Sequence, residues 1–289
     1  MSGFTGLRVL ALESRRAPEL AKLISSYGGE PVVAPAMREV PLESNQETLA
    51  FAAALLAGEF DMVIFLTGVG ARALLSVVET AYKREDYIAA LQGVNVVARG
   101  PKPVAVLREL GVTPGVTVPE PNTWRELLAA LDEAGASREE LRLRGARVAV
   151  QEYGVSNPEL LSGLRERGAD VTRVPVYQWA MPDDRAPLQA AVKALANEEI
   201  DTVLFTTSVQ VVHLFQMAAE MKLEDPMRRG LSRTIVASIG PTTSEELQRR
   251  GIRADLEPSH PKMGFLVKET AERSAELLRR KRVGFGSAG

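Results

Sequence analysis

The chain has 289 residues, 45% hydrophobic and 25% charged, and its 35 basic and 37 acidic residues give a net charge of −2. This length exceeds one hydrophobic core, so we expect two domains, and the near-neutral charge disfavours nucleic acid or an anionic membrane as a partner. With no cysteine and only His213 and His260, the ligands for a zinc or iron site are too few, although carboxylates could still hold magnesium or calcium.

The sequence also lacks the features of an exported or membrane-spanning protein. No run approaches the ~20 apolar residues that a membrane span requires. The N-terminal segment Met1–Arg8 lacks the basic stretch followed by an apolar stretch that marks a secretory signal. Since there are no cysteines for disulfide bonds either, we expect a cytoplasmic protein.

Short apolar runs rich in β-branched residues predict strands that are buried on both faces of a sheet. They are Arg8–Leu12, Met62–Leu66, Val94–Ala98, Arg147–Gln151, Thr202–Thr206 and Thr234–Ile239. Amphipathic segments between these runs predict helices, among them Ala17–Tyr27, Leu49–Gly58, Ala71–Tyr82, Pro158–Arg167 and Val209–Met221. The alternation predicts an α/β protein with doubly wound, open parallel sheets.

The C-terminal part of the chain adds one helix and a tail. The helix is expected over Met263–Arg280, with Phe265, Leu266 and Val267 facing the core, and the glycine-rich segment 283–289 is expected to be disordered. His213 lies in an apolar stretch of a predicted helix. We therefore expect it to be a packed histidine and not a catalytic base.

A repeat with a spacing of 140 residues organises the chain. Pro18-Glu19-Leu20 recurs as Pro158-Glu159-Leu160, and Gly100-Pro101 recurs as Gly240-Pro241 (240 − 100 = 140). Five single residues recur at the same spacing: Gly28 as Gly168, Pro35 as Pro175, Asp61 as Asp201, Phe65 as Phe205 and Gly111 as Gly251. Matches that keep one register over this length indicate an internal duplication, hence two similar domains.

Two equivalent segments, Glu30–Leu42 and Ala169–Pro182, are too long for one strand of a compact sheet. At about 3.3 Å per residue each could extend ~40 Å, about twice a usual strand. We expect each to begin as a strand of its own sheet and then to cross to the other domain, so that the pair forms a two-stranded connector.

This crossing predicts interleaved domains. One would contain residues 1–36 and 179–289, and the other residues 40–175. The strand Arg8–Leu12 would then share a sheet with strands of the C-terminal half and not with Met62–Leu66. The alternative is two sequential domains divided near Ala136.

Ligands of open parallel sheets bind beyond the carboxyl ends of the strands, where helix N-termini offer unpaired N–H groups. Each such junction is also compatible with an ordinary helix cap. Together, six of them predict a cleft between the domains that suits a ligand with several carboxylates or phosphates. The six are Glu13-Ser14-Arg15, Thr67-Gly68-Val69-Gly70, Arg99-Gly100-Pro101-Lys102, Glu152-Tyr153-Gly154, Thr206-Thr207-Ser208 and Gly240-Pro241-Thr242-Thr243.

Other chemistries find little support in the motifs. The sequence contains neither a phosphate-binding G-x-x-x-x-G-K-[ST] loop nor a G-x-G-x-x-G motif after the first strand. It also lacks a G-x-S-x-G nucleophile elbow. Nucleotide use and covalent hydrolase chemistry are therefore disfavoured.

Several of these segments together resemble uroporphyrinogen-III synthase. They are Phe65-Leu66-Thr67 and Phe205-Thr206-Thr207-Ser208 after matching strands, Gly240-Pro241-Thr242-Thr243 at a helix start, and Val174-Pro175-Val176-Tyr177-Gln178 in the second connector. The resemblance covers about residues 7–270. It implies a cofactor-independent lyase that cyclises hydroxymethylbilane to uroporphyrinogen III, with loss of water and inversion of the last pyrrole ring.

The resemblance also implies roles for individual residues. Tyr177 would be the catalytic proton donor. The candidate contacts to the substrate's carboxylates are Thr67, Thr207, Ser208, Thr242 and Thr243. The sequence departs from the family at two places. Thr67-Gly68 stands where Ser-Pro is common, and Lys102 and Pro103 stand where a hydroxyl residue is common. Lys102 is either a further candidate for binding a carboxylate or simply solvated.

The resemblance implies hydroxymethylbilane as the small-molecule substrate, and we expect a monomer with no metal, nucleic acid or membrane as a partner. The competing hypothesis is a non-enzymatic binding protein of the hinge type, since two α/β lobes joined by two strands are also typical of small-molecule receptors. A regulatory sensor derived from the synthase is a further alternative.

Overall fold

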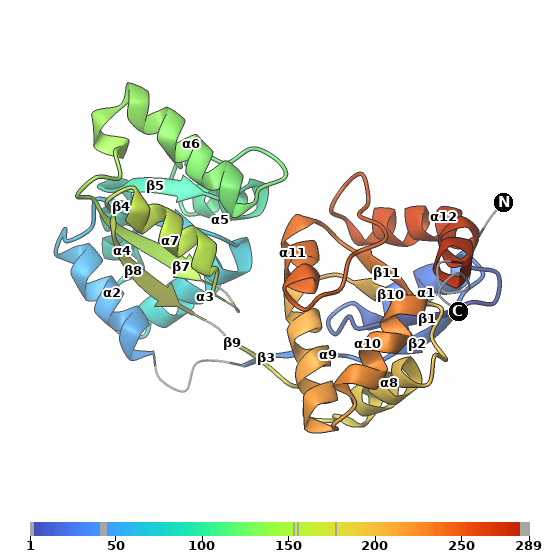
Figure 1. Ribbon diagram of the computed structural model, residues 1–289. Helices are drawn as coiled ribbons and strands as arrows, with labels where there is room; N and C mark the ends of the chain where they lie inside the picture. The colour runs from blue at the N-terminus through green and yellow to red at the C-terminus, as the bar shows by residue number, and fades with distance from the viewer. Residues whose placement is uncertain (1–2, 41–44, 153, 155, 177, 284–289) are drawn as a thin grey trace. The chain divides into compact units, whose positions relative to one another are not determined.

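The computed structural model describes residues 3–40, 45–152, 154, 156–176 and 178–283. The chain divides into two compact units, one formed by Met1–Arg38 and Ala180–Gly289, and the other by Glu39–Trp179. We call them unit 1 and unit 2. Each contains a parallel β-sheet with helices on both faces (Figure 1).

The sheet of unit 1 has the strand order β11-β10-β1-β2. Its strands are β1 (Arg8–Ala11), β2 (Glu30–Val33), β10 (Thr202–Phe205) and β11 (Ile235–Ser238). Val9 pairs with Thr202, which confirms that the first strand shares a sheet with strands of the C-terminal half.

Side chains of these strands alternate between two hydrophobic clusters, as expected for a sheet that is covered on both faces. Leu10, Val203 and Phe205 contribute to one cluster with α8 (Ala186–Ala196), α9 (Ser208–Glu220), α10 (Glu224–Arg233) and α11 (Pro241–Arg249). Val9, Leu204 and Ile235 contribute to the other with α1 (Ala17–Ser26) and α12 (Met263–Val283). Both faces of the sheet are therefore buried.

The sheet of unit 2 has the order β6-β5-β4-β7-β8. Its strands are β4 (Met62–Phe65), β5 (Asn95–Ala98), β6 (Val116–Thr117), β7 (Arg147–Glu152) and β8 (Asp170–Pro175). Since β4 pairs with β7 and β1 with β10, strands on both sides of Ala136 are shared within each sheet. The alternative of two sequential domains divided near Ala136 is therefore wrong.

Helices also cover both faces of this second sheet. Val63, Phe65 and Val96 pack with α2 (Gln46–Leu56), α3 (Gly68–Val78), α4 (Arg84–Gln92) and α5 (Pro101–Glu109). Met62, Ile64 and Val97 pack with α6 (Trp124–Ser137), the short 3₁₀ helix η1 (Glu139–Leu141) and α7 (Pro158–Glu166). The doubly wound α/β architecture is thus present in each unit.

The two connecting segments pair with each other as predicted. After β2 the chain continues into β3 (Arg38–Val40), and after β8 it continues into β9 (Gln178–Ala180). These two short strands form a separate two-stranded sheet.

Elements of the two units correspond at a constant offset. β4 begins at Met62 and β10 at Thr202 (202 − 62 = 140), and α2 begins at Gln46 and α8 at Ala186 (186 − 46 = 140). The first strand of each half is an exception. Ala11 of β1 pairs with Leu204, and Val150 of β7 pairs with Ile64, the residue equivalent to Leu204 (204 − 64 = 140). Ala11 and Val150 are therefore equivalent at an offset of 139 (150 − 11 = 139).

Two sequence predictions need correction. Helix α3 begins at Gly68 and not at Ala71, because the Thr67 side chain caps it from its N-terminal end. Leu266 and Val267 are fully buried, but Phe265 is 36% exposed and packs against His260, with 4.6 Å between the ring centroids and the rings tilted by 42°. In a helix only some of three consecutive residues can face the core.

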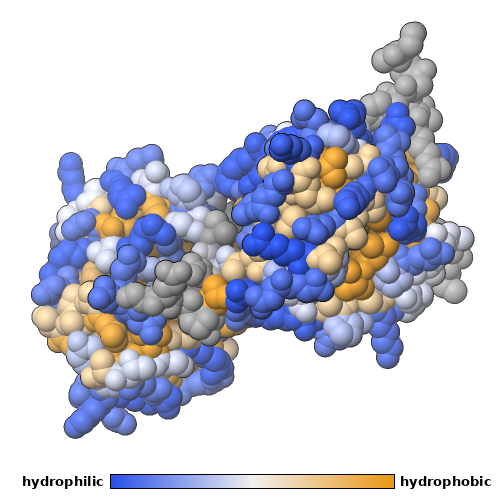
Figure 2. Space-filling view, turned by 90° about the horizontal axis from the view of Figure 1, so that it is seen from below, coloured by the Kyte–Doolittle hydropathy of each residue, from blue (hydrophilic) through white to orange (hydrophobic). Residues whose placement is uncertain are grey.

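On the face shown in Figure 2, hydrophilic side chains alternate with apolar areas on both units. Among the residues that the structure describes, the exposed large hydrophobic side chains are Val33, Val69 and Phe265. Residues 284–289, most of the tail expected to be disordered, lie outside the described residues.

Candidate functional site

Thr67 lies where β4 of unit 2 ends and α3 begins. Its backbone is extended (φ −145°), and its hydroxyl accepts a hydrogen bond from the Gly70 amide at 3.0 Å. A Cβ at Gly68 would lie 2.7 Å from the Lys102 carbonyl oxygen, so the first turns of α3 and α5 approach each other there. The departure from Ser-Pro at Thr67-Gly68 therefore has a physical reason, since only glycine fits this approach.

The neighbouring turn, Arg99-Gly100-Pro101-Lys102, joins β5 to α5. Gly100 has φ +136°, and a Cβ there would lie 2.8 Å from the Asn122 side chain. Pro101 occupies the first helical turn, where its missing N–H costs nothing. Lys102 is exposed. The structure thus brings Thr67 and Lys102 to the same edge of unit 2.

Thr207 and Ser208 lie at the corresponding edge of unit 1, between β10 and α9. Thr207 is the N-cap residue (φ −161°), but its hydroxyl makes no cap hydrogen bond. Both residues are half-buried. A hydroxyl at a helix N-terminus that is not used by the helix can donate to, or accept from, a ligand.

Thr242 and Thr243 begin α11 at the next strand end of the same sheet. β10 pairs with β11, and α9 is in contact with α11, so all four of these hydroxyl residues lie on neighbouring elements. Thr242 is exposed, whereas Thr243 is 3% exposed. Of the two, Thr242 offers its hydroxyl to solvent.

Two carboxylates, Glu13 and Glu152, lie in strand-end junctions that the sequence predicted, but they were not among the candidate site residues. Glu13 lies two residues after β1, and Glu152 is the last residue of β7. Because Ala11 and Val150 are equivalent, these two carboxylates are equivalent too (152 − 13 = 139). Glu13 accepts a hydrogen bond from the Thr206 hydroxyl at 2.6 Å. The Gln210 amide in turn donates to that hydroxyl at 2.8 Å.

Glu152 has different partners in unit 2. It is 3% exposed, and its carboxylate accepts hydrogen bonds from Arg173 Nε at 2.8 Å and from the Ser156 hydroxyl at 2.6 Å. A buried carboxylate needs such partners to offset its desolvation. Position at a strand end was the only sequence signal for these two residues, since Arg173 lies 21 residues from Glu152 and Thr206 lies 193 residues from Glu13.

Tyr177, the predicted proton donor, lies outside the described residues. His213 is 6% exposed, and its Nδ1 lies 2.7 Å from the Ala36 carbonyl oxygen. Burial lowers the pKa of His213, and the hydrogen bond to Ala36 acts in the opposite direction. The prediction of a packed, structural histidine is confirmed.

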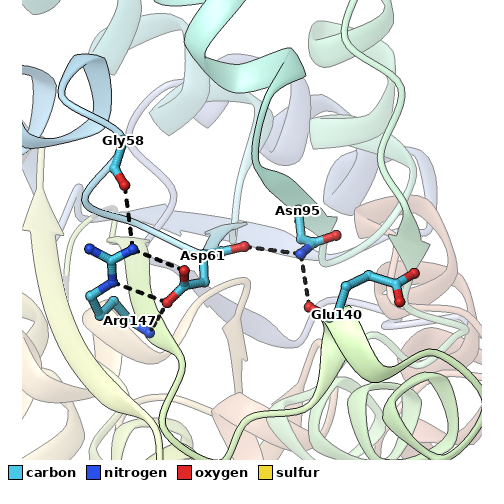
Figure 3. A network of polar contacts seen from close by, with 5 residues as sticks. All are labelled: Gly58, Asp61, Asn95, Glu140 and Arg147. Atoms are coloured by element: carbon cyan, nitrogen blue, oxygen red, sulfur yellow. Dashed lines mark hydrogen bonds and ion pairs between the residues drawn. The ribbon is translucent and has the colours of Figure 1, made fainter.

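A cavity of about 1030 Å³ lies at the opposite, N-terminal edge of the unit 2 sheet, lined in part by Asp61, Asn95 and Glu140. Figure 3 shows how these groups bind one another. The Asp61 carboxylate accepts hydrogen bonds from the backbone amide and the guanidinium of Arg147, while Asn95 Nδ2 donates to the backbone carbonyls of Asp61 and Glu140. This network joins the starts of β4 and β7 and is structural.

Within the described ranges, no group of three or more histidine, cysteine, aspartate or glutamate side chains is placed to hold a metal ion. Across the same residues, no helix combines the length and the apolar character that crossing a membrane requires.

Comparisons with known proteins point to one family. Residues 18–268 match the family described as uroporphyrinogen-III synthase HemD. The chain is 31% identical over 274 residues to the uncharacterized protein YjjA of Bacillus subtilis, covering 93% of this chain and 97% of that protein. It is 31% identical over 243 residues to a putative uroporphyrinogen-III synthase of Methanothermobacter thermautotrophicus, covering 83% of this chain and 87% of that protein.

The fold agrees with a solved structure. A mutant uroporphyrinogen III synthase of Thermus thermophilus aligns with a TM-score of 0.73 at 24% identity, covering 94% of this chain and 99% of that one.

Proposed function

Because the chain belongs to the uroporphyrinogen-III synthase family, we propose that it cyclises hydroxymethylbilane to uroporphyrinogen III, a lyase reaction of tetrapyrrole biosynthesis that needs no cofactor. The family match over residues 18–268 carries this proposal. We also propose that the protein acts as a cytoplasmic monomer, and that the 140-residue correspondence of its units reflects an internal duplication.

The substrate carries eight carboxylates, which the strand ends of the two units are suited to bind. The Thr207 hydroxyl is not used by its own helix, and Thr242 and Lys102 are exposed at helix starts. Hydrogen bonds from such groups to ionised carboxylates are stronger than those between neutral groups. We assign carboxylate binding to Thr67, Lys102, Thr207, Ser208, Thr242 and Thr243, with Thr242 the stronger candidate of the last pair.

The chemistry begins with loss of the hydroxyl group from the first ring. Hydroxide is a poor leaving group, so a proton donor at that oxygen lowers the barrier. We assign this role to Tyr177. The resulting azafulvene is attacked by the last ring to give a spiro intermediate, and fragmentation and reclosure then invert that ring. The protein also holds the flexible linear substrate in a folded conformation, which reduces the entropic cost of cyclisation.

The test is to incubate the purified protein with hydroxymethylbilane and to separate the I and III isomers of uroporphyrinogen. The proposal requires the III isomer to exceed the amount formed without protein, and turnover to survive exhaustive chelation in the absence of nucleotides. Tight binding of the substrate with only the I isomer formed would instead favour the alternative, a hinge-type binding or regulatory protein for an anionic small molecule.

A further inference from the structure

We propose that Arg99 is an additional carboxylate-binding residue at the strand ends of unit 2. The inference deepens the proposed function, on which the identity of the carboxylate ligand rests. Three observations about Arg99 carry it: its place on the sheet, the absence of a partner for its charge among the described residues, and the residue that stands at the equivalent place in unit 1.

Arg99 directly follows β5 at the carboxyl edge of the sheet. Phe65 pairs with Ala98, and the Arg99 amide donates to the Phe65 carbonyl at 3.0 Å, so Arg99 lies beside the residues that lead into Thr67. It also opens the turn that ends at Lys102. Arg99 therefore belongs to the edge at which ligands of open parallel sheets bind.

Within the part of the chain that the structure describes, the guanidinium of Arg99 has no counterion. The side chain is half-buried, and burial lowers its pKa from the ordinary value. Among the described residues, no side chain or carbonyl group forms a hydrogen bond or ion pair with it. Glu152 ends β7 at the same edge, but its carboxylate is already bound by Arg173 and Ser156.

A partly desolvated cation without a partner is unfavourable, because burial removes water that nothing replaces. A guanidinium offers five N–H donors in a planar fork that matches the two oxygens of a carboxylate. A carboxylate ligand at this edge would remove the penalty and gain charge-assisted hydrogen bonds. Arg99 is thus suited to a carboxylate that the described residues of the free protein do not supply.

The fold itself does not require a charge at this place. The equivalent residue of unit 1 is Ile239 (239 − 99 = 140), which follows β11 in the same way and donates its amide to Phe205. The turn after Ile239 carries the hydroxyl residues Thr242 and Thr243, whereas the turn after Arg99 carries Lys102. Unit 2 therefore offers cations where unit 1 offers hydroxyl groups.

The experiment compares Arg99→Ile, which installs the unit 1 residue, with Arg99→Lys and with the control Arg108→Met, an exposed arginine in the last turn of α5. Three quantities are measured: the melting temperature, the affinity for uroporphyrin III, a stable octacarboxylate, and the KM for hydroxymethylbilane. Loss of a charge-assisted contact is expected to weaken binding about 10- to 100-fold.

We expect Arg99→Ile to raise Kd and KM by that factor while its melting temperature stays equal to or above that of the wild type. Arg99→Lys should keep part of the affinity, and Arg108→Met should bind like the wild type. A lower melting temperature with unchanged affinity in Arg99→Ile would show a structural role and overturn the inference.

The remaining outcomes separate this inference from the proposed function. Normal turnover with unchanged KM and Kd in Arg99→Ile would overturn the inference and leave the synthase function in place. Uroporphyrin binding that depends on Arg99, in a protein that forms no III isomer, would support the inference and contradict the synthase function. A wild-type protein that binds no uroporphyrin and forms no III isomer would overturn both.

Discussion

Thr67 and Thr207 hold equivalent N-cap positions (207 − 67 = 140), yet only the Thr67 hydroxyl binds its own helix. The Thr67 hydroxyl accepts from the Gly70 amide at 3.0 Å, whereas that of Thr207 forms no hydrogen bond within the described part of the chain. The difference extends to the helix, where Gly70 corresponds to Gln210 (210 − 70 = 140). Both threonines are assigned to carboxylate binding, but the Thr67 hydroxyl also caps its own helix, whereas the Thr207 hydroxyl remains fully available to a ligand.

Replacing each threonine by valine separates the two roles. Thr67→Val removes a helix cap and should lower the free energy of unfolding by about 1 kcal/mol. Thr207→Val removes no hydrogen bond to a described residue, so it should leave stability nearly unchanged and raise the KM for hydroxymethylbilane several-fold. Urea unfolding and steady-state kinetics measure both effects. Equal losses of stability in the two variants would contradict this assignment.

Tyr177→Phe tests the proposed proton donor. The first-copy equivalent of Tyr177 is Met37 (177 − 140 = 37), so the phenol is specific to the second copy. The substitution keeps the ring and removes the proton, and general acids typically contribute about 10² to 10⁴ in rate. We expect kcat to fall within that range at an unchanged melting temperature. Near-normal kcat would remove Tyr177 from the mechanism and leave conformational control as the main source of catalysis.

Tyr87→Phe provides a matched control at a buried tyrosine. Tyr87 is 1% exposed, and its hydroxyl has no hydrogen-bond partner among the described residues. Burial raises the pKa of Tyr87, so its phenol stays protonated. Removing an unsatisfied hydroxyl should leave the free energy of unfolding unchanged or raise it by up to about 1 kcal/mol, with kcat unaffected. A clear loss of stability in thermal unfolding would show that the hydroxyl has a partner.

The strands could be predicted well from the sequence, because buried parallel strands are short apolar runs. In this chain, strands of the two units also recur at the 140-residue spacing of the repeat. Helix starts were less predictable. Ala71 is the first residue of a clear amphipathic pattern, but the Thr67 cap begins α3 at Gly68. Phe265 is apolar like its two buried neighbours, and only the packing of α12 shows that it is exposed.

The candidate site was predictable as a set of strand ends but not in its electrostatics. Glu152 and Arg173 are 21 residues apart, and only the pairing of β7 with β8 brings them together. For the same reason, the lack of a partner for Arg99 among the described residues cannot be read from a sequence that contains 37 acidic residues. Pairing between strands decides which charges are neutralised within the protein.

Asp61→Asn tests the network at the opposite edge of the unit 2 sheet. Hydrogen bonds from Arg147 lower the pKa of Asp61, so this contribution to stability is present above the ordinary value of 3.8 and is lost as the pH falls through the lower folded-state pKa. The pair is about half exposed, so we expect a loss of about 1 kcal/mol or less at neutral pH. KM should not change. A large rise in KM would mean that this edge also binds substrate.

His213 predicts a second, separate dependence of stability on pH. Burial lowers the pKa of His213 in the folded protein below the ordinary value of 6.5, so at pH values just below 6.5 the unfolded chain binds more protons than the folded one. Stability therefore falls as the pH decreases from 6.5 through the folded-state pKa, and above 6.5 His213 contributes no pH dependence.

His213→Gln keeps a donor near the Ala36 carbonyl but cannot titrate, so it should show a smaller loss of stability between pH 7 and pH 5 than the wild type. His260→Gln is the matched control, since His260 is exposed. Urea midpoints measured across this range for the three proteins decide the matter: if wild type and His213→Gln lose the same stability, a group other than His213 causes the acid sensitivity.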